Sequence, residues 1–102
     1  MSTEQNAGPT KKTAKVVDKG YGYVAIADEA LSALVRVSDI SCITDGTQEV
    51  VYHDGISVVG KQLPSSTVAT AHGKLIFWGH IRNRLSAIVL KYAKLETEKE
   101  TK

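Results

Sequence analysis

The chain has 102 residues, of which 42% are hydrophobic and 24% charged, and its formal net charge is +2. This length supports one modest hydrophobic core and is too short for two. The sequence has no run approaching roughly 18 consecutive apolar residues and no apolar stretch near its start, so it predicts neither a membrane-spanning helix nor a secretory signal. We therefore expect a single-domain cytoplasmic protein. The lone Cys42 can form no disulfide within the chain, which fits that compartment.

The charge is distributed unevenly along the chain. Residues 1–54 hold eight acidic and five basic side chains, a balance of −3. Residues 55–95 hold six basic side chains and no acidic one, a balance of +6, and residues 96–102 return −1. Such asymmetry between segments is typical of a protein that has an anionic partner.

The first 13 residues are polar and include Gly8-Pro9 and Lys11-Lys12, so they predict a disordered N-terminal arm. From Ala14 to about residue 63, short runs of β-branched and aromatic residues alternate with glycine-containing turns, which predicts strands. Asp54-Gly55 lies between two alternating runs and is the clearest signal of a β-hairpin. Cys42 falls within an apolar alternation and is expected to be buried. An antiparallel meander of four to five strands follows from these patterns.

The C-terminal part predicts a long amphipathic helix. From Trp78 to Leu95 the large apolar side chains fall within an arc of roughly 120° on a helical projection, the width of a core-facing stripe. Pro64-Ser65-Ser66-Thr67 is typical of a helix entry, so we favour one helix over about residues 65–95. The alternative is a strand over residues 74–78, bracketed by Gly73 and Gly79, with a helix that begins only afterwards. The fold class is α+β, with one domain over residues 14–95 and a charged, frayed tail over residues 96–102.

No motif in the chain indicates a reaction. The three histidines, His53, His72 and His80, are far apart in sequence and lack the spacing of a metal site, so we expect no metal and no cofactor. The aspartates fall at predicted turns, where their carboxylates serve the backbone, and no nucleophile elbow is present. We expect a non-enzymatic protein.

Two faces of the predicted helix are candidate sites. Basic side chains flank the apolar stripe and can neutralise phosphates, so we assign them to an anionic partner, with nucleic acid or an acidic protein as the candidates. These residues are His80, Arg82, Arg84, Lys91 and Lys94. A helix over residues 65–95 would be ~45 Å long, more than a sheet of strands about 17–20 Å long can cover. The surplus predicts a homo-oligomer, a dimer first, through Leu75, Trp78, Ile81, Leu85, Ile88, Tyr92 and Leu95.

These expectations combine into a small binding or regulatory module that associates with itself through its C-terminal helix and contacts an anionic partner. The alternative is an adaptor, inhibitor or assembly component that docks on another protein through the apolar helix face, in which case the basic residues only cover apolar surface with their stems. Neither interpretation places the protein in a membrane.

Overall fold

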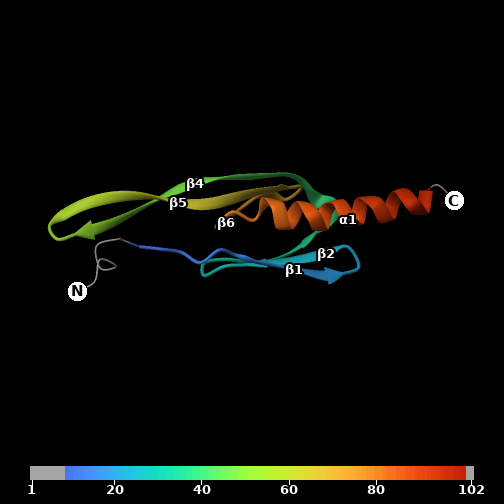
Figure 1. Cartoon of the computed structure of the whole chain (residues 1–102), viewed down its shortest axis with the longest axis horizontal. Helices are drawn as coiled ribbons and strands as arrows, with labels where there is room; N and C mark the ends of the chain where they lie inside the picture. The colour runs from blue at the N-terminus through green and yellow to red at the C-terminus, as the bar shows by residue number, and fades with distance from the viewer. Residues whose placement is uncertain (1–8, 101–102) are drawn as a thin grey trace.

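The computed structural model describes residues 9–100, with side chains described through residue 95, and its fold is α+β (Figure 1). The described residues form two three-stranded antiparallel sheets and one α-helix. The first sheet contains β1 (Lys15–Gly20), β2 (Tyr23–Ala27) and β3 (Ser32–Arg36). A short 3-10 helix, η2 (Val37–Asp39), leads to the second sheet, which contains β4 (Ile40–Asp54), β5 (Ser57–Thr70) and β6 (Gly73–Trp78). The chain then forms α1 (Arg82–Glu100).

The α+β class is confirmed, and the predicted meander fits in part, with six strands in place of four or five. Its predicted single sheet is divided at η2, where the chain passes from β3 to β4. The Val37 N–H donates to the Gly22 carbonyl, and the Ala71 N–H donates to the Asp39 carbonyl. These bonds attach the connecting segment to a turn of each sheet, so η2 joins the two sheets.

The molecule is elongated, with principal extents of 66 × 27 × 18 Å. Its length comes from β4 and β5, which pair continuously from Ile40–Thr70 to Asp54–Ser57. Strand β6 pairs only with residues 65–70 of β5. Residues 47–64 therefore form a two-stranded ribbon, which we call the arm. In Figure 1 the arm extends to one end of the molecule, and α1 extends to the other.

The predicted Asp54-Gly55 hairpin forms the end of the arm. Asp54 pairs with Ser57, which leaves Gly55 and Ile56 as a two-residue loop. Gly55 has a φ of +69°, the sign that a type II′ hairpin turn requires at its first central position. Glycine adopts this backbone conformation without a steric penalty, so Gly55 fixes the place where the ribbon reverses.

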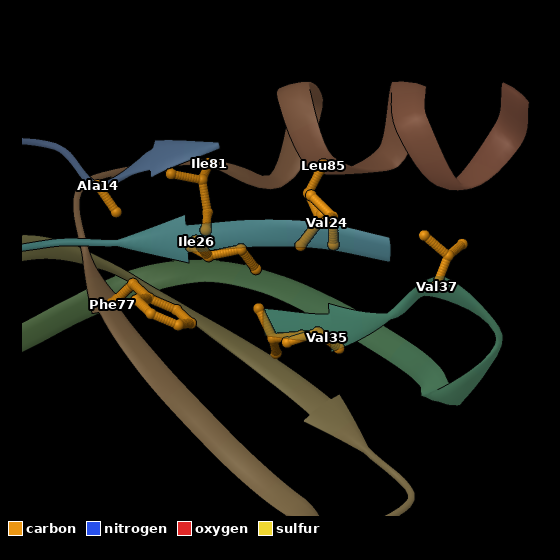
Figure 2. Close-up of a cluster of buried hydrophobic side chains, with 9 residues drawn as sticks. Ala14, Val24, Ile26, Val35, Val37, Phe77, Ile81 and Leu85 are labelled. Atoms are coloured by element: carbon orange, nitrogen blue, oxygen red, sulfur yellow. The ribbon is translucent and has the colours of Figure 1, made fainter. Parts of the chain in front are cut away.

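The core lies where both sheets meet α1 (Figure 2). Side chains from β2, β3 and β6 meet the segment that leads into the helix and its first turn. The fully buried members with less than 2% exposure include Val24, Ile26, Phe77, Ile81 and Leu85. Fully burying one such aliphatic side chain contributes about 1.5–3 kcal/mol, so this cluster is the main source of stability.

The helix begins at Arg82, so the favoured prediction of a helix from residue 65 is wrong and the strand alternative is correct. Gly73 and Gly79 have φ values of +131° and +88°, which an α-helix cannot accommodate. Residues 65–72, between Pro64 and Gly73, and residues 74–78, between Gly73 and Gly79, contain many β-branched and aromatic residues, which favour strands. Pro64 is tolerated in β5 because β6 ends opposite Ser65, so the ladder needs no N–H from Pro64 on that side.

Tertiary contacts cap the start of α1. The Ile81 N–H donates to the Ser66 hydroxyl, at 3.0 Å, and the Arg82 N–H donates to Asp45 Oδ1, at 3.2 Å. The Ser66 hydroxyl lies 2.7 Å from Asp45 Oδ1 and 2.8 Å from the Gly79 carbonyl oxygen, and its single proton is donated to one of them. Ser66 was predicted to cap a helix beginning in its own segment. It instead satisfies a backbone N–H that lies 15 residues further along the chain.

Asp28 joins the two sheets. One of its oxygens accepts the Trp78 N–H at 2.7 Å, and the other accepts the Ala30 and Leu31 N–H groups at 2.8 Å each. Burial raises the pKa of Asp28, but these three N–H donors outweigh it, so its pKa lies below the usual value. The ionised carboxylate is therefore the form that holds the loop after β2 against the end of β6.

The two predicted terminal segments are described only in part. Residues 1–8 of the predicted N-terminal arm lie outside the described residues, whereas residues 9–13 lie within them. Lys11 Nζ lies 5.9 Å from the centre of the Trp78 ring, and the Ala14 N–H donates to the Trp78 carbonyl. The helix continues past Leu95 to Glu100, and residues 101–102 lie outside the described part.

Two further expectations concern the surface. Cys42 is exposed, so the prediction that it is buried is wrong; its side chain points away from the core on β4, with Sγ 3.7 Å from Thr44 Oγ1. Within residues 9–100, no helix is both long and apolar enough to cross a membrane.

Candidate interaction surfaces

The predicted basic site does not assemble into one patch. His80 precedes the helix, and its Nε2 lies 2.8 Å from the Gly46 carbonyl oxygen. Lys91 Nζ lies 2.7 Å from Asp18 Oδ2, so its charge is already paired. Arg82, Arg84 and Lys94 are exposed on α1, but Arg82 and Arg84 project about 200° apart at 100° per residue. A straight phosphate backbone would meet only some of these side chains at once.

Most of the predicted oligomer interface is used inside the chain. Ile81 and Leu85 are 0% exposed and belong to the core. Leu75 and Trp78 lie on β6 rather than on the helix. Leu75, Ile88 and Tyr92 are partly buried against the core cluster. Of the seven predicted residues, Leu95 is the one that remains exposed, at 45%.

The arm carries the most conspicuous apolar surface. Val51 and Val58 are 62% and 63% exposed, and Ile56 at the loop is fully exposed. Val51 and Val58 lie on the same face of the ribbon, because Val51 pairs with Gly60, His53 pairs with Val58, and residues two apart on a strand share a face. Apolar side chains grouped on a projecting element are typical of an interaction site.

Among residues 9–100, neither edge of the arm has a neighbouring strand. Strand β4 is the edge of its sheet, and β5 has no partner on its other side before Ser65. An isolated two-stranded ribbon is only marginally stable in water, and long unprotected edges invite pairing with another chain. The arm therefore combines exposed apolar side chains with strand edges that no other described strand covers, and a partner that binds there covers both.

A groove lies at the opposite end of the molecule, where α1 extends over the β1–β2 turn and η2. It has a volume of about 870 Å³. Its lining is mainly apolar and aromatic and includes Tyr21, Tyr23, Ile40, Val89, Tyr92 and Leu95. The one charged side chain among the lining residues is that of Arg36, whose Nη2 donates to the Tyr23 hydroxyl at 3.1 Å. The same contact raises the pKa of Arg36 above its ordinary value, so its charge is permanent.

Asp18 lies next to the groove and holds the side chain of Tyr92, which lines it. Its Oδ1 accepts from the Tyr92 hydroxyl at 2.7 Å and from the Gly20 N–H at 2.9 Å, and its Oδ2 pairs with Lys91. Lys91 is the strongest influence, with Tyr92 second, and together they hold the pKa of Asp18 at about 2, below 3.8. These bonds attach the middle of α1 to the end of β1, next to the β1–β2 turn. They therefore set the distance between the two sides of the groove, which are α1 and the β1–β2 turn.

Tyr21 at the rim of the groove has an unusual backbone. Its φ is +56°, and it is the one residue other than glycine with a positive φ among those described. The left-handed conformation costs an aromatic residue about 1–2 kcal/mol. Tyr21 and Gly22 (φ +84°) form the two-residue loop between the paired residues Gly20 and Tyr23, and a type I′ hairpin turn requires a positive φ at both loop positions. The β1–β2 hairpin therefore imposes this conformation on Tyr21, whose side chain is fully exposed.

Sequence reasoning missed the arm and the groove as sites. The signal for the arm was present: Val50-Val51 and Val58-Val59 place apolar residues on both faces of one hairpin, whereas a half-buried ribbon needs only one apolar face. The groove had no sequence signal, because it joins residues from the β1–β2 turn, η2 and α1 that are far apart in the chain.

The described residues contain no group of three or more His, Cys, Asp or Glu side chains that could hold a metal ion. A smaller cavity of about 210 Å³ lies between β3 and β6 and includes Asp39 and His72, whose side chains approach to 3.5 Å. No protein-family model matches the sequence, and no curated protein or solved structure matches it significantly. The arm and the groove are thus the features from which a function is argued.

Proposed function

We propose that this chain is a non-enzymatic assembly component that docks on a protein partner through its arm. The observation that carries this proposal is the projecting ribbon, on which Val51, Ile56 and Val58 are exposed and beside which no further strand lies among the described residues. Adding a strand or packing an apolar face against the ribbon are both common modes of protein recognition. The proposal follows the adaptor alternative from the sequence, with the arm in place of the helix as the docking element.

Binding of nucleic acid is less favoured by the geometry. Lys91 is paired with Asp18, and His80 contacts the Gly46 carbonyl. Arg82, Arg84 and Lys94 are the predicted basic residues that remain exposed on α1, and they point in different directions around the helix. Titration with random-sequence DNA and RNA at two salt concentrations tests this alternative, because phosphate contacts give a steep salt dependence.

The proposal is tested by comparing co-purified proteins for three tagged forms of the full chain. The forms are the wild type, Ile56→Asp in the arm, and Leu90→Asp as a matched control on an exposed apolar residue of α1 (58% exposed). We expect Ile56→Asp to lose a protein partner that Leu90→Asp retains, and the purified partner to bind the wild type again. If the arm variant keeps every partner of the wild type, the arm is not the docking element.

A further inference from the structure

We infer that the partner of the arm is a second copy of this chain, and that the arm tip of one copy seats in the groove between α1 and the β1–β2 turn of the next. This inference rests on the proposed function and names its partner. It is argued from three properties of the described residues: the positions of the two surfaces, their chemistry and their charge.

The positions exclude a contact within one copy. The arm tip and the groove lie at opposite ends of a molecule 66 Å long (Figure 1). The arm is a continuous ladder from Gln48–Leu63 to Asp54–Ser57, so it does not fold back over the chain. Two complementary surfaces that cannot meet within one molecule can be satisfied by a neighbouring copy placed head to tail.

The chemistry of the two surfaces matches. The tip presents Ile56, Val58 and Val51, which are aliphatic side chains without polar atoms. The groove offers apolar and aromatic walls, with Leu95 45% exposed and Tyr21 fully exposed at the rim. A volume of about 870 Å³ is ample for several side chains, since pockets of about 300–1,000 Å³ hold drug-sized ligands. Insertion would also bury the Tyr21 side chain, which is fully exposed in a single copy.

The charges of the two surfaces are opposite. Between Val50 and Gly60 the arm tip contains one acidic residue, Asp54, and no lysine or arginine. The charged side chain that lines the groove is Arg36, which donates to the Tyr23 hydroxyl and is also attracted by Asp39, whereas Asp18 beside the groove is paired with Lys91. If two arm tips met, the Asp54 carboxylates of the two copies would approach each other and repel. If a tip enters the groove, Asp54 instead approaches Arg36 of the other copy. Such complementarity favours the head-to-tail arrangement over a symmetric contact between arms.

The contact uses different surfaces on the two copies. Such a contact closes into a ring where the rotation between neighbours allows it and otherwise continues as a filament. It also predicts a property that a symmetric contact between two arms cannot have. A copy with a defective arm and a copy with a defective groove still share one intact pair of surfaces, so together they form a 1:1 complex that cannot grow further.

The test uses the purified full-length protein alone, sized by light scattering and analytical ultracentrifugation up to high micromolar concentration. The variants are Ile56→Asp for the arm and Leu95→Asp for the groove, with Leu90→Asp as the control on α1. Circular dichroism confirms that each variant folds, and all three positions are exposed on the surface. We expect the wild type and Leu90→Asp to associate, and each of the other variants to weaken association at least about 30-fold, as at an interface hot spot. An equimolar mixture of Ile56→Asp and Leu95→Asp should form a 1:1 complex.

Each contrary result overturns the inference in its own way. A monomeric wild type excludes the second copy, while the co-purification experiment still decides whether the arm binds another protein. Association that survives Ile56→Asp excludes the arm, and association that survives Leu95→Asp excludes the groove. If both variants are monomeric and their mixture stays monomeric, the contact is not between the arm of one copy and the groove of another.

Discussion

Substitution of Ser66 by alanine tests whether tertiary contacts determine where α1 begins. Ser66 is 1% exposed, and its hydroxyl accepts the Ile81 N–H and lies within hydrogen-bond distance of Asp45 and Gly79. The change removes one oxygen and leaves almost no cavity. Its main cost is a buried Ile81 N–H without an acceptor, which amounts to about 1–3 kcal/mol, similar to the loss of a helix cap at about 1 kcal/mol.

We expect Ser66→Ala to lower the free energy of unfolding by about 2 kcal/mol. For a domain of this size, 1 kcal/mol corresponds to about 4–8 °C in Tm, so Tm should fall by about 8–16 °C. Urea unfolding measures the change, because the fluorescence of the single Trp78 reports the end of β6 and circular dichroism reports α1. Hydrogen exchange at the Ile81 N–H should also become faster.

Ser65→Ala is the matched control. Ser65 is 5% exposed and adjacent to Ser66, but the N–H groups at the start of α1 donate to Ser66 and Asp45 and not to Ser65. We expect its effect to lie within about 0.5 kcal/mol of the wild type. If Ser66→Ala costs no more than Ser65→Ala, the contacts of Ser66 do not determine the start of the helix, and the packing of Ile81 and Leu85 is sufficient to place it.

Three further predictions concern other positions. Asp18→Asn should reduce stability at neutral pH and flatten its acid dependence: because the pKa of Asp18 is about 2 in the fold against 3.8, the Asp18 contribution is present above pH 3.8 and is lost as pH falls toward 2. Acid titration of circular dichroism at low salt measures this. Gly79→Ala should destabilise by at least about 2 kcal/mol, because φ is +88° and the new Cβ would lie 2.6 Å from Thr13 Cα. Tyr21→Gly should stabilise the monomer by up to about 1 kcal/mol, measured by thermal unfolding, while it weakens self-association.

Each of these predictions has a result that contradicts it. An unchanged acid profile for Asp18→Asn would show that the bonds from Lys91 and Tyr92 do not stabilise the fold. Gly46→Ala is the control for Gly79, because its new Cβ would meet no atom within 4 Å; equal losses for the two variants would refute the close approach of Thr13. A loss of stability in Tyr21→Gly would show that the left-handed backbone at Tyr21 is not strained.

The sequence was sufficient for the fold class and for the Asp54-Gly55 hairpin, since both follow from local patterns. It was insufficient for residues 65–77, where an apolar spacing compatible with a helix competes with β-branched residues. The positive φ values of Gly73 and Gly79 decide between them, and a sequence shows that glycine permits such values but not that the chain adopts them. Ser66 shows the same limit, because its cap function was predicted while its partner, Ile81, lies in another element.

The candidate site was predicted less well than the fold. The apolar stripe of the helix was recognised, but whether such a stripe faces a neighbouring sheet or a neighbouring molecule depends on the space between elements. Ile81 and Leu85 face the two sheets and are buried in the core, so they are not available to a partner. Lys91 could not be recognised as paired, because Asp18 lies 73 residues away in the chain. A surface that is assembled from distant segments has no characteristic residue spacing by which the sequence could reveal it.

The bonds that join the layers have a consequence for how the chain folds. Asp28 meets Trp78 across 50 residues, and Asp18 meets Lys91 and Tyr92 across 73 and 74. Bringing such distant segments together costs chain entropy before the stabilising contacts form, and this slows folding. During synthesis, the β1–β3 meander leaves the ribosome with the apolar sides of Val24 and Ile26 uncovered until Phe77 and Leu85 follow. We therefore expect folding in a single late step, in which β6 and α1 cover the apolar side of the β1–β3 sheet.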